Sequence, residues 1–193
     1  GQLKLIRKLQ PEARTVGILY TTSEANSLYA IAQYQQLAGD YGFTIDAVAV
    51  TTQSEVTQAL DKLLSDNTGT YEIEMTIKNR NAEIVGFQLF NSKGEEVDIY
   101  YNLVEKKFAM DRSKSGIVSF SQDFPIVTFA PIEDNSEMTL RLFIDKSSIE
   151  AFGEDGRFAM TNLVFPSEPY NRISFYAKGG SYTVSSFKVY KLK

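Results

Sequence analysis

The sequence predicts a mainly β protein, an antiparallel, jelly-roll-like β-sandwich preceded by a small α/β segment in the order strand, helix, strand, helix. Two observations predict this class. Residues 1–65 contain short apolar runs separated by stretches with helical spacing, whereas from residue 66 onward apolar and polar side chains alternate with period two. We therefore expect two domains, an α/β segment at 1–65 and a sandwich at 66–193.

The α/β segment begins with residues 3–13, which predict a helix. Residues 14–20 form an apolar run typical of a strand covered on both faces. A helix follows, with Ser23 as its expected N-cap and glycines near residue 40 as its end. Residues 43–50 predict a second strand, and Ser54 caps a second helix. Because strands and helices alternate here, the two strands should be parallel.

The second half shows strand periodicity almost throughout. Clear alternation occurs at residues 71–78, 97–103, 140–145 and 173–176. Turn signals rich in Gly, Asn, Ser and Lys separate the strands, at residues 91–94, 113–116, 133–136 and 178–180. About ten short strands without a long helix are typical of a sandwich.

Residues 145–166, "DKSSIEAFGEDGRFAMTNLVFP", predict a hairpin. Ile149 and Ala151 should point inward and Glu150 and Phe152 outward, before a glycine-bracketed turn at 153–156 and a returning strand. As a catalytic acid, Glu150 would need a second carboxylate at a defined distance. Its outward position favours a structural or interface role instead.

Composition narrows the chemistry that this chain can perform. The chain has 193 residues, a net charge of -4, no Cys, no His and no Trp. The acidic balance argues against nucleic-acid binding, and no apolar run is long enough for membrane insertion. Without Cys or His, thiol catalysis and the commonest transition-metal ligands are excluded. We expect neither a cofactor nor a metal.

Three stretches resemble the C-terminal β-sandwich domain of glycoside hydrolase family 32, the invertases, levanases and inulinases. They are "YYNLVEKKFAMDRSKSG" (100–116), "LRLFIDKSSIEAFGEDGRFAMTNLVFP" (140–166) and "YAKGGSYTVSSFKVYKLK" (176–193). The resemblance covers about 125 residues. It implies a scaffold domain, because in this family the chemistry belongs to an upstream five-bladed propeller.

The propeller's catalytic motifs do not occur in this chain, which lacks Asn-Asp-Pro and Arg-Asp-Pro tripeptides as well as Trp and Cys. The resemblance therefore implies a non-catalytic module that stabilises a missing propeller partner or shapes oligomers, with no catalytic residue of its own. It also implies a parent glycosidase acting on β-fructosides, in the bacterial periplasm, at the cell surface or secreted.

Residues 1–65 resemble part of a lobe of an ABC-transporter substrate-binding protein. The quoted stretches are "ARTVGILYTTSEANS" and "YGFTIDAVAVTTQSEVTQALDKLLS". By matching position, the resemblance implies solute contacts at Thr22, Ser23, Asn26 and Ser27, although an ordinary capped helix explains this stretch as well. Since the two resemblances are unrelated, we interpret the chain as a chimera, either a fusion or a misassembled reading frame.

An alternative function is a carbohydrate-binding module that holds a fructan oligosaccharide. Outward Tyr100 and Tyr176 could stack on sugar rings, and Asp111 and Arg112 could hydrogen-bond vicinal hydroxyls. The competing interpretation is that Asp111 caps its turn and Arg112 pairs with a neighbour. An open sheet edge would also favour a homodimer.

Overall fold

The computed structural model describes residues 2–9, 11–21, 25–50, 58, 69–79, 81–133 and 136–191. The N-terminal elements are α1 (Gln2–Leu9), β1 (Thr15–Thr21), α2 (Ala25–Ala38), the 3-10 helix η1 (Gly39–Tyr41) and β2 (Thr44–Val50). The predicted leading helix, both strands and the helix between them are confirmed, and β1 and β2 are parallel neighbours. Of the helix predicted to begin at Ser54, the structure describes Gln58 alone, which is helical, and the cap at Ser23 lies outside the described residues.

The period-two region forms ten strands, as the alternation predicts. They are β3 (Tyr71–Asn79), β4 (Ile84–Phe90), β5 (Glu96–Asn102), β6 (Lys107–Lys114), β7 (Val127–Pro131), β8 (Glu137–Ile144), β9 (Ser148–Gly153), β10 (Phe158–Leu163), β11 (Arg172–Lys178) and β12 (Tyr182–Lys191). A short 3-10 turn, η2 (Glu154–Gly156), joins β9 to β10.

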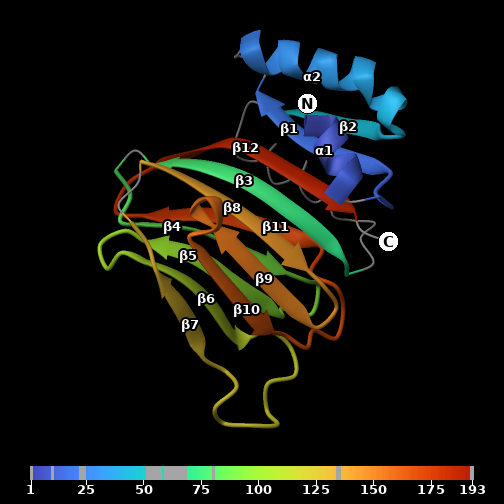
Figure 1. The fold of residues 1–193 in the computed structure, drawn as a ribbon. Coiled ribbons are helices and arrows are strands. Elements are labelled where there is room, and N and C mark those ends of the chain that lie inside the picture. The colour runs from blue at the N-terminus through green and yellow to red at the C-terminus, as the bar shows by residue number, and fades with distance from the viewer. Residues whose placement is uncertain are drawn as a thin grey trace.

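Two sheets pack face to face (Figure 1). The larger has seven strands in the order β10-β9-β8-β3-β12-β1-β2, and the smaller has five in the order β11-β4-β5-β6-β7. All pairs in the five-stranded sheet are antiparallel. The mainly β sandwich predicted from the sequence is therefore confirmed.

The N-terminal strands continue the larger sheet of the sandwich. Strand β1 pairs antiparallel with β12, with Val16 opposite Tyr190 and Leu19 opposite Phe187. The predicted boundary between residues 65 and 66 lies outside the described residues. The elements on its two sides are joined by main-chain hydrogen bonds of one sheet.

Inward side chains of both sheets fill the core between them. Among them, Phe108 stacks on Phe158 with ring centroids 4.7 Å apart, and both side chains are buried. A second, smaller cluster lies under the helices, where Leu3, Ile31 and Tyr190 are buried together. The helices therefore cover the β12-β1-β2 end of one face of the larger sheet (Figure 1).

Arg7 of α1 contacts the turn η1 that follows α2. Its guanidinium donates to the carbonyl oxygens of Tyr41, at 2.8 Å, and Gly42, at 2.9 Å, and lies 4.0 Å from the ring centroid of Phe43. Gly42 has φ 69°, which suits a residue that ends a helical turn. Within the described residues, neither helix is long and apolar enough to cross a membrane.

Candidate functional site

The outer face of the five-stranded sheet carries aromatic residues in one row across the strands. Tyr176 of β11 lies opposite Gly86 of β4, Gly86 opposite Tyr100 of β5, Tyr100 opposite Ala109 of β6, and Ala109 opposite Phe129 of β7. We call Tyr176, Tyr100 and Phe129 the aromatic row. Since neighbouring strands are about 4.8 Å apart, successive aromatic residues are separated by about 10 Å at their backbones.

The small residue between the two tyrosines lets one ring lie along the sheet. A Cβ atom on Gly86 would be 2.6 Å from Cζ of Tyr176 and 2.8 Å from Cβ of Tyr100. The Tyr176 hydroxyl reaches across β4 and donates to the carboxylate of Asp98, whose oxygens lie 2.8 and 3.0 Å away. The Tyr176 ring is thus fixed at both ends, flat over β4.

Carboxylates lie beside the aromatic row on the same face. Asp98 of β5 lies opposite Asp111 of β6. Burial raises the pKa of Asp98 above its ordinary value; the hydrogen bond from Tyr176 opposes this shift, and the charge of Asp111 adds to it. Burial and then the bond to Asp98 raise the pKa of Tyr176, so its hydroxyl remains a donor at neutral pH. The face offers both rings and hydrogen-bond acceptors.

The structure brings three of the four predicted carbohydrate contacts together and separates the fourth. Tyr100, Tyr176 and Asp111 share the outer face, as the alternation with buried Tyr101 and Met110 and with Phe175, which packs against the core, requires. Arg112 follows Asp111 on the other side of β6. Its Nε donates to the Phe124 carbonyl oxygen at 2.9 Å, and its guanidinium lies 4.2 Å from that ring's centroid. Arg112 therefore contacts the loop after β6 and lies apart from the other three, and its sugar contact stays a prediction.

Two residues of this outer face were not among the site residues predicted from the sequence. Asp98 and Phe129 occupy outward positions of their strands, and Phe129 is 62% exposed. The outward position of Asp98 is readable from its alternation with buried Val97 and Ile99. Its contact with Tyr176 depends on the pairing of β4 with both β5 and β11, which one strand's pattern does not reveal.

The family-like loop at 111–116 has a structural role for most of its residues. Asp111 Oδ1 accepts from the Ser113 amide at 2.8 Å, as predicted for a turn cap. The Tyr170 hydroxyl donates to the Ser115 carbonyl oxygen. Gly116, at φ 125°, passes so close to Phe165 that an added Cβ would lie 2.2 Å from its carbonyl oxygen. The loop is thereby held against the segment after β10.

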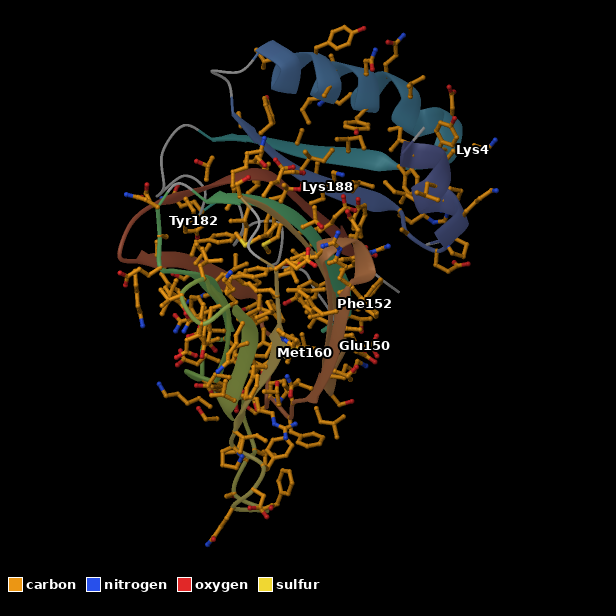
Figure 2. All side chains as sticks on the ribbon, turned by 60° about the vertical axis from the view of Figure 1, so that its left-hand side comes forward. Lys4, Glu150, Phe152, Met160, Tyr182 and Lys188 are labelled. Carbon is orange, nitrogen blue, oxygen red and sulfur yellow. The ribbon has the colours of Figure 1, made fainter. Side chains whose placement is uncertain are left out.

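The predicted hairpin at 145–166 is confirmed as β9, η2 and β10. Ile149 and Ala151 are fully buried, whereas Glu150 and Phe152 face outward from β9 (Figure 2). The residues opposite Glu150 on its two neighbouring strands are Phe143 and Thr161. Since neither is a carboxylate, the register supports the structural interpretation of Glu150.

The structure describes only the backbone of two of the four predicted solute-contact residues. Thr22 and Ser23 lie outside the described residues. Asn26 and Ser27 belong to the first turn of α2, but their side chains are outside the described part. These four contacts stay a prediction. In the parts of the chain that the structure does describe, no group of three or more acidic side chains could hold a metal ion.

The two packed antiparallel sheets and the loops at 111–116 and 145–166 define a β-sandwich module. A family model described as "Glycosyl hydrolases family 32 C terminal" matches residues 44–191. The chain therefore belongs to the glycosyl hydrolase family 32 C-terminal domain family. The match begins in β2, within the segment that we expected to be a separate domain.

Two levanases and an exo-inulinase share this region. A levanase of Bacillus sp. (strain L7) is 34% identical over 129 residues, which cover 65% of this chain and 14% of that protein. A levanase of Bacillus subtilis (strain 168) is 29% identical over 143 residues, 72% of this chain and 21% of that protein. The crystal structure of exo-inulinase from Aspergillus awamori superposes with a TM-score of 0.59 and 25% identity, covering 66% of this chain and 26% of that one.

The chain thus spans a small share of each of these relatives. None of the three is a solute-binding protein. The transporter resemblance of residues 1–65 and the chimeric origin stay predictions.

Proposed function

We propose that this chain is a non-catalytic β-sandwich module of a fructan-acting glycosidase and supports a separate catalytic domain. The observation that carries the proposal is the family match over 44–191, shared with levanases that are several times longer than the matched region. The family-like loop at 111–116 is also engaged mainly in packing, which is the behaviour of a scaffold.

Two assays test this proposal. The purified chain, incubated with levan, inulin and sucrose, should release no fructose. The same chain should raise the melting temperature of a family 32 propeller expressed from the matching gene, because a partner that binds the folded state stabilises it. Fructose release by the chain alone would overturn the non-catalytic assignment, and an unchanged melting temperature would overturn the supporting role.

A second candidate function is weak fructan binding through the outer face of the five-stranded sheet. The aromatic row and the neighbouring Asp98 and Asp111 support it, since sugar sites combine ring faces with a few fixed polar groups. Tyr100→Ala combined with Tyr176→Ala should abolish retardation of the chain in a levan-containing gel. Leu5→Ala removes an exposed apolar side chain from α1, far from the aromatic row, and should leave the retardation unchanged. Equal migration of all three proteins with and without levan would remove this candidate.

We further propose that the parent protein acts outside the cytoplasm. Two related exo-inulinases, from Aspergillus niger and Aspergillus ficuum, carry "extracellular" in their names and are each 35% identical over 83 residues. Peptide mapping of culture supernatant, periplasm and cytosol from the source organism tests this. Recovery of the peptides only from cytosol would contradict it.

A further inference from the structure

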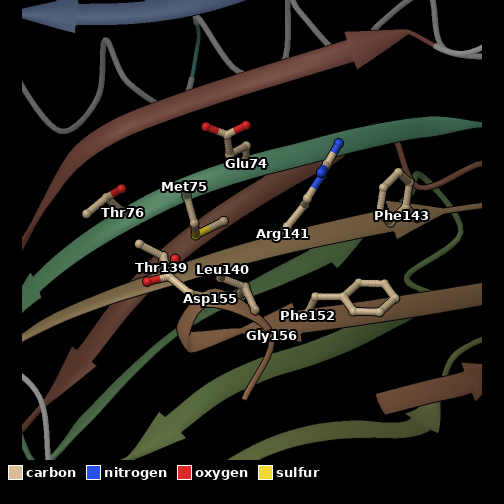
Figure 3. A pocket seen from close by; sticks show the side chains of 10 residues that line it. All are labelled: Glu74, Met75, Thr76, Thr139, Leu140, Arg141, Phe143, Phe152, Asp155 and Gly156. Atoms are coloured by element: carbon tan, nitrogen blue, oxygen red, sulfur yellow. The ribbon is translucent and has the colours of Figure 1, made fainter. Parts of the chain in front are cut away.

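The larger sheet holds a cavity on the same face as the helices, over the strands that the helices leave uncovered. Its volume is about 510 Å³, and β3, β8, β9 and the turn η2 supply its walls (Figure 3). The side chains that matter for its chemistry are Glu74, Thr139, Arg141, Phe143, Phe152 and Asp155. This size lies within the usual range of small-molecule sites. The cavity is on the opposite side of the sandwich from the aromatic row.

One side of the cavity is aromatic. Phe143 and Phe152 meet edge to face, with ring centroids 5.9 Å apart and planes at 85°. Phe152 is 37% exposed, so part of its surface remains open to a ligand. In Figure 3 the two rings lie beside each other at one end of the cavity, with Arg141 next to Phe143. The guanidinium of Arg141 is 5.0 Å from the Phe143 ring centroid.

The polar side chains of the cavity are held in place by partners. Strand register puts Arg141 between Glu74 on β3 and Phe152 on β9. Arg141 donates through Nε to the buried carboxylate of Glu72, which fixes the plane of the guanidinium. Glu74 Oε1 accepts from Lys188 Nζ at 2.9 Å. Donors and acceptors are therefore both positioned before a ligand arrives.

The turn η2 supplies a further acceptor at the opposite end. Asp155 Oδ1 accepts from the Thr139 hydroxyl at 3.4 Å. The Asp155 side chain is exposed, so its carboxylate is accessible to a ligand. Asp155 has φ 57° and follows Glu154 at φ 51°. Two consecutive non-glycine residues in the left-handed region turn the chain back over the sheet, next to Thr139.

The mixture of charges selects the class of ligand. The carboxylates of Glu74 and Asp155 would repel an anionic ligand, and the guanidinium of Arg141 would repel a cationic one. An apolar ligand would remove these three side chains from water without replacing their hydrogen bonds. A neutral ring with several hydroxyl groups can donate to the carboxylates, accept from the guanidinium and stack on Phe152. We propose that this cavity binds a neutral saccharide, independently of the aromatic row.

The test is a titration of the full chain, followed by backbone amide NMR, with three pyranose probes of nearly one shape: glucose, glucuronate and glucosamine. The neutral sugar should bind most tightly and shift the amide signals of Phe152 and Gly156. Preferred binding of the acidic or the basic sugar, or no shift of these signals by glucose, would overturn the proposal.

Two variants locate the binding. Phe152→Ala should weaken glucose binding about threefold to tenfold, because it removes the accessible ring. The matched control, Tyr29→Ala, removes an exposed ring from α2, outside both the cavity and the aromatic row, and should have no effect. Asp155→Asn, which tolerates the left-handed backbone, should weaken binding by a similar factor through loss of a charged acceptor. Unchanged glucose affinity in both cavity variants, each with wild-type circular dichroism, would overturn the proposal.

Discussion

At the scale of single residues, the arrangement of Tyr176 on the outer face of the five-stranded sheet requires a glycine at position 86. Gly86 leaves room for the Tyr176 ring, which in turn reaches Asp98. We expect Gly86→Ala to force the ring away from β4, break the bond to Asp98 and lower the free energy of unfolding by about 1–3 kcal/mol. Urea unfolding measures this change. An unaltered midpoint would show that the ring moves aside without loss.

The raised pKa of Asp98 predicts a dependence of stability on pH. A carboxyl whose pKa is higher in the folded than in the unfolded state binds protons more tightly when folded, so it lowers stability as pH rises from the unfolded to the folded value. Asp98→Asn removes this loss and can still accept from Tyr176. The variant should have a higher melting temperature than the wild type at pH 7 and a smaller difference at pH 3. A difference independent of pH would contradict this cause.

Single positions also show how far the sequence alone could lead. Alternation correctly placed Tyr100 and Tyr176 on an outer face. Asp111 and Arg112 were grouped because they are adjacent in sequence. The structure separates them, because the chain leaves regular pairing near the end of β6, where the register with β5 shifts, and the Arg112 side chain turns to Phe124. The cavity beside Arg141 was not predicted at all, since it depends on which strands lie side by side.

At the scale of elements, β3 and β8 are joined by an ion pair whose carboxylate is almost fully enclosed. Glu72 is 1% exposed, and it accepts from Arg141. The alternation at 71–78 predicted an outward Glu72 but not its burial, because the covering side chains come from other strands. Strand existence was thus predictable from local sequence, and the environment of the outer faces was not.

Removing one partner of this pair should be costly. We expect Arg141→Met to lower the free energy of unfolding by about 3 kcal/mol, because Glu72 stays buried without its cationic partner. The double variant Glu72→Leu with Arg141→Met should recover most of the loss, since a buried pair can often be replaced by apolar side chains. Chemical denaturation of the three proteins measures both effects. A double variant no more stable than Arg141→Met would contradict this account.

At the scale of the whole molecule, β1 and the two helices cover an edge and part of a face of the sandwich. Truncation to residues 51–193 would leave the main-chain groups of β12 unpaired on one side and expose buried Tyr190. We expect the truncated chain to self-associate, because exposed strand edges pair with other chains. Light scattering coupled to size-exclusion chromatography tests this. A monomeric truncated chain with the full-length melting temperature would instead favour the predicted independence of the two segments.

The strand β12 has a consequence for how the protein is made. It follows the other described strands in sequence, yet it lies between β3 and β1 in the sheet. Until the ribosome has synthesised β12, β3 and β1 each lack this neighbour, and the seven-stranded sheet cannot close. The nascent polypeptide must therefore keep β3 and β1 unpaired on that side until β12 emerges, which lengthens its exposure to misfolding and to chaperones. Loss of β12 would separate β1 and β2 from the other strands of their sheet.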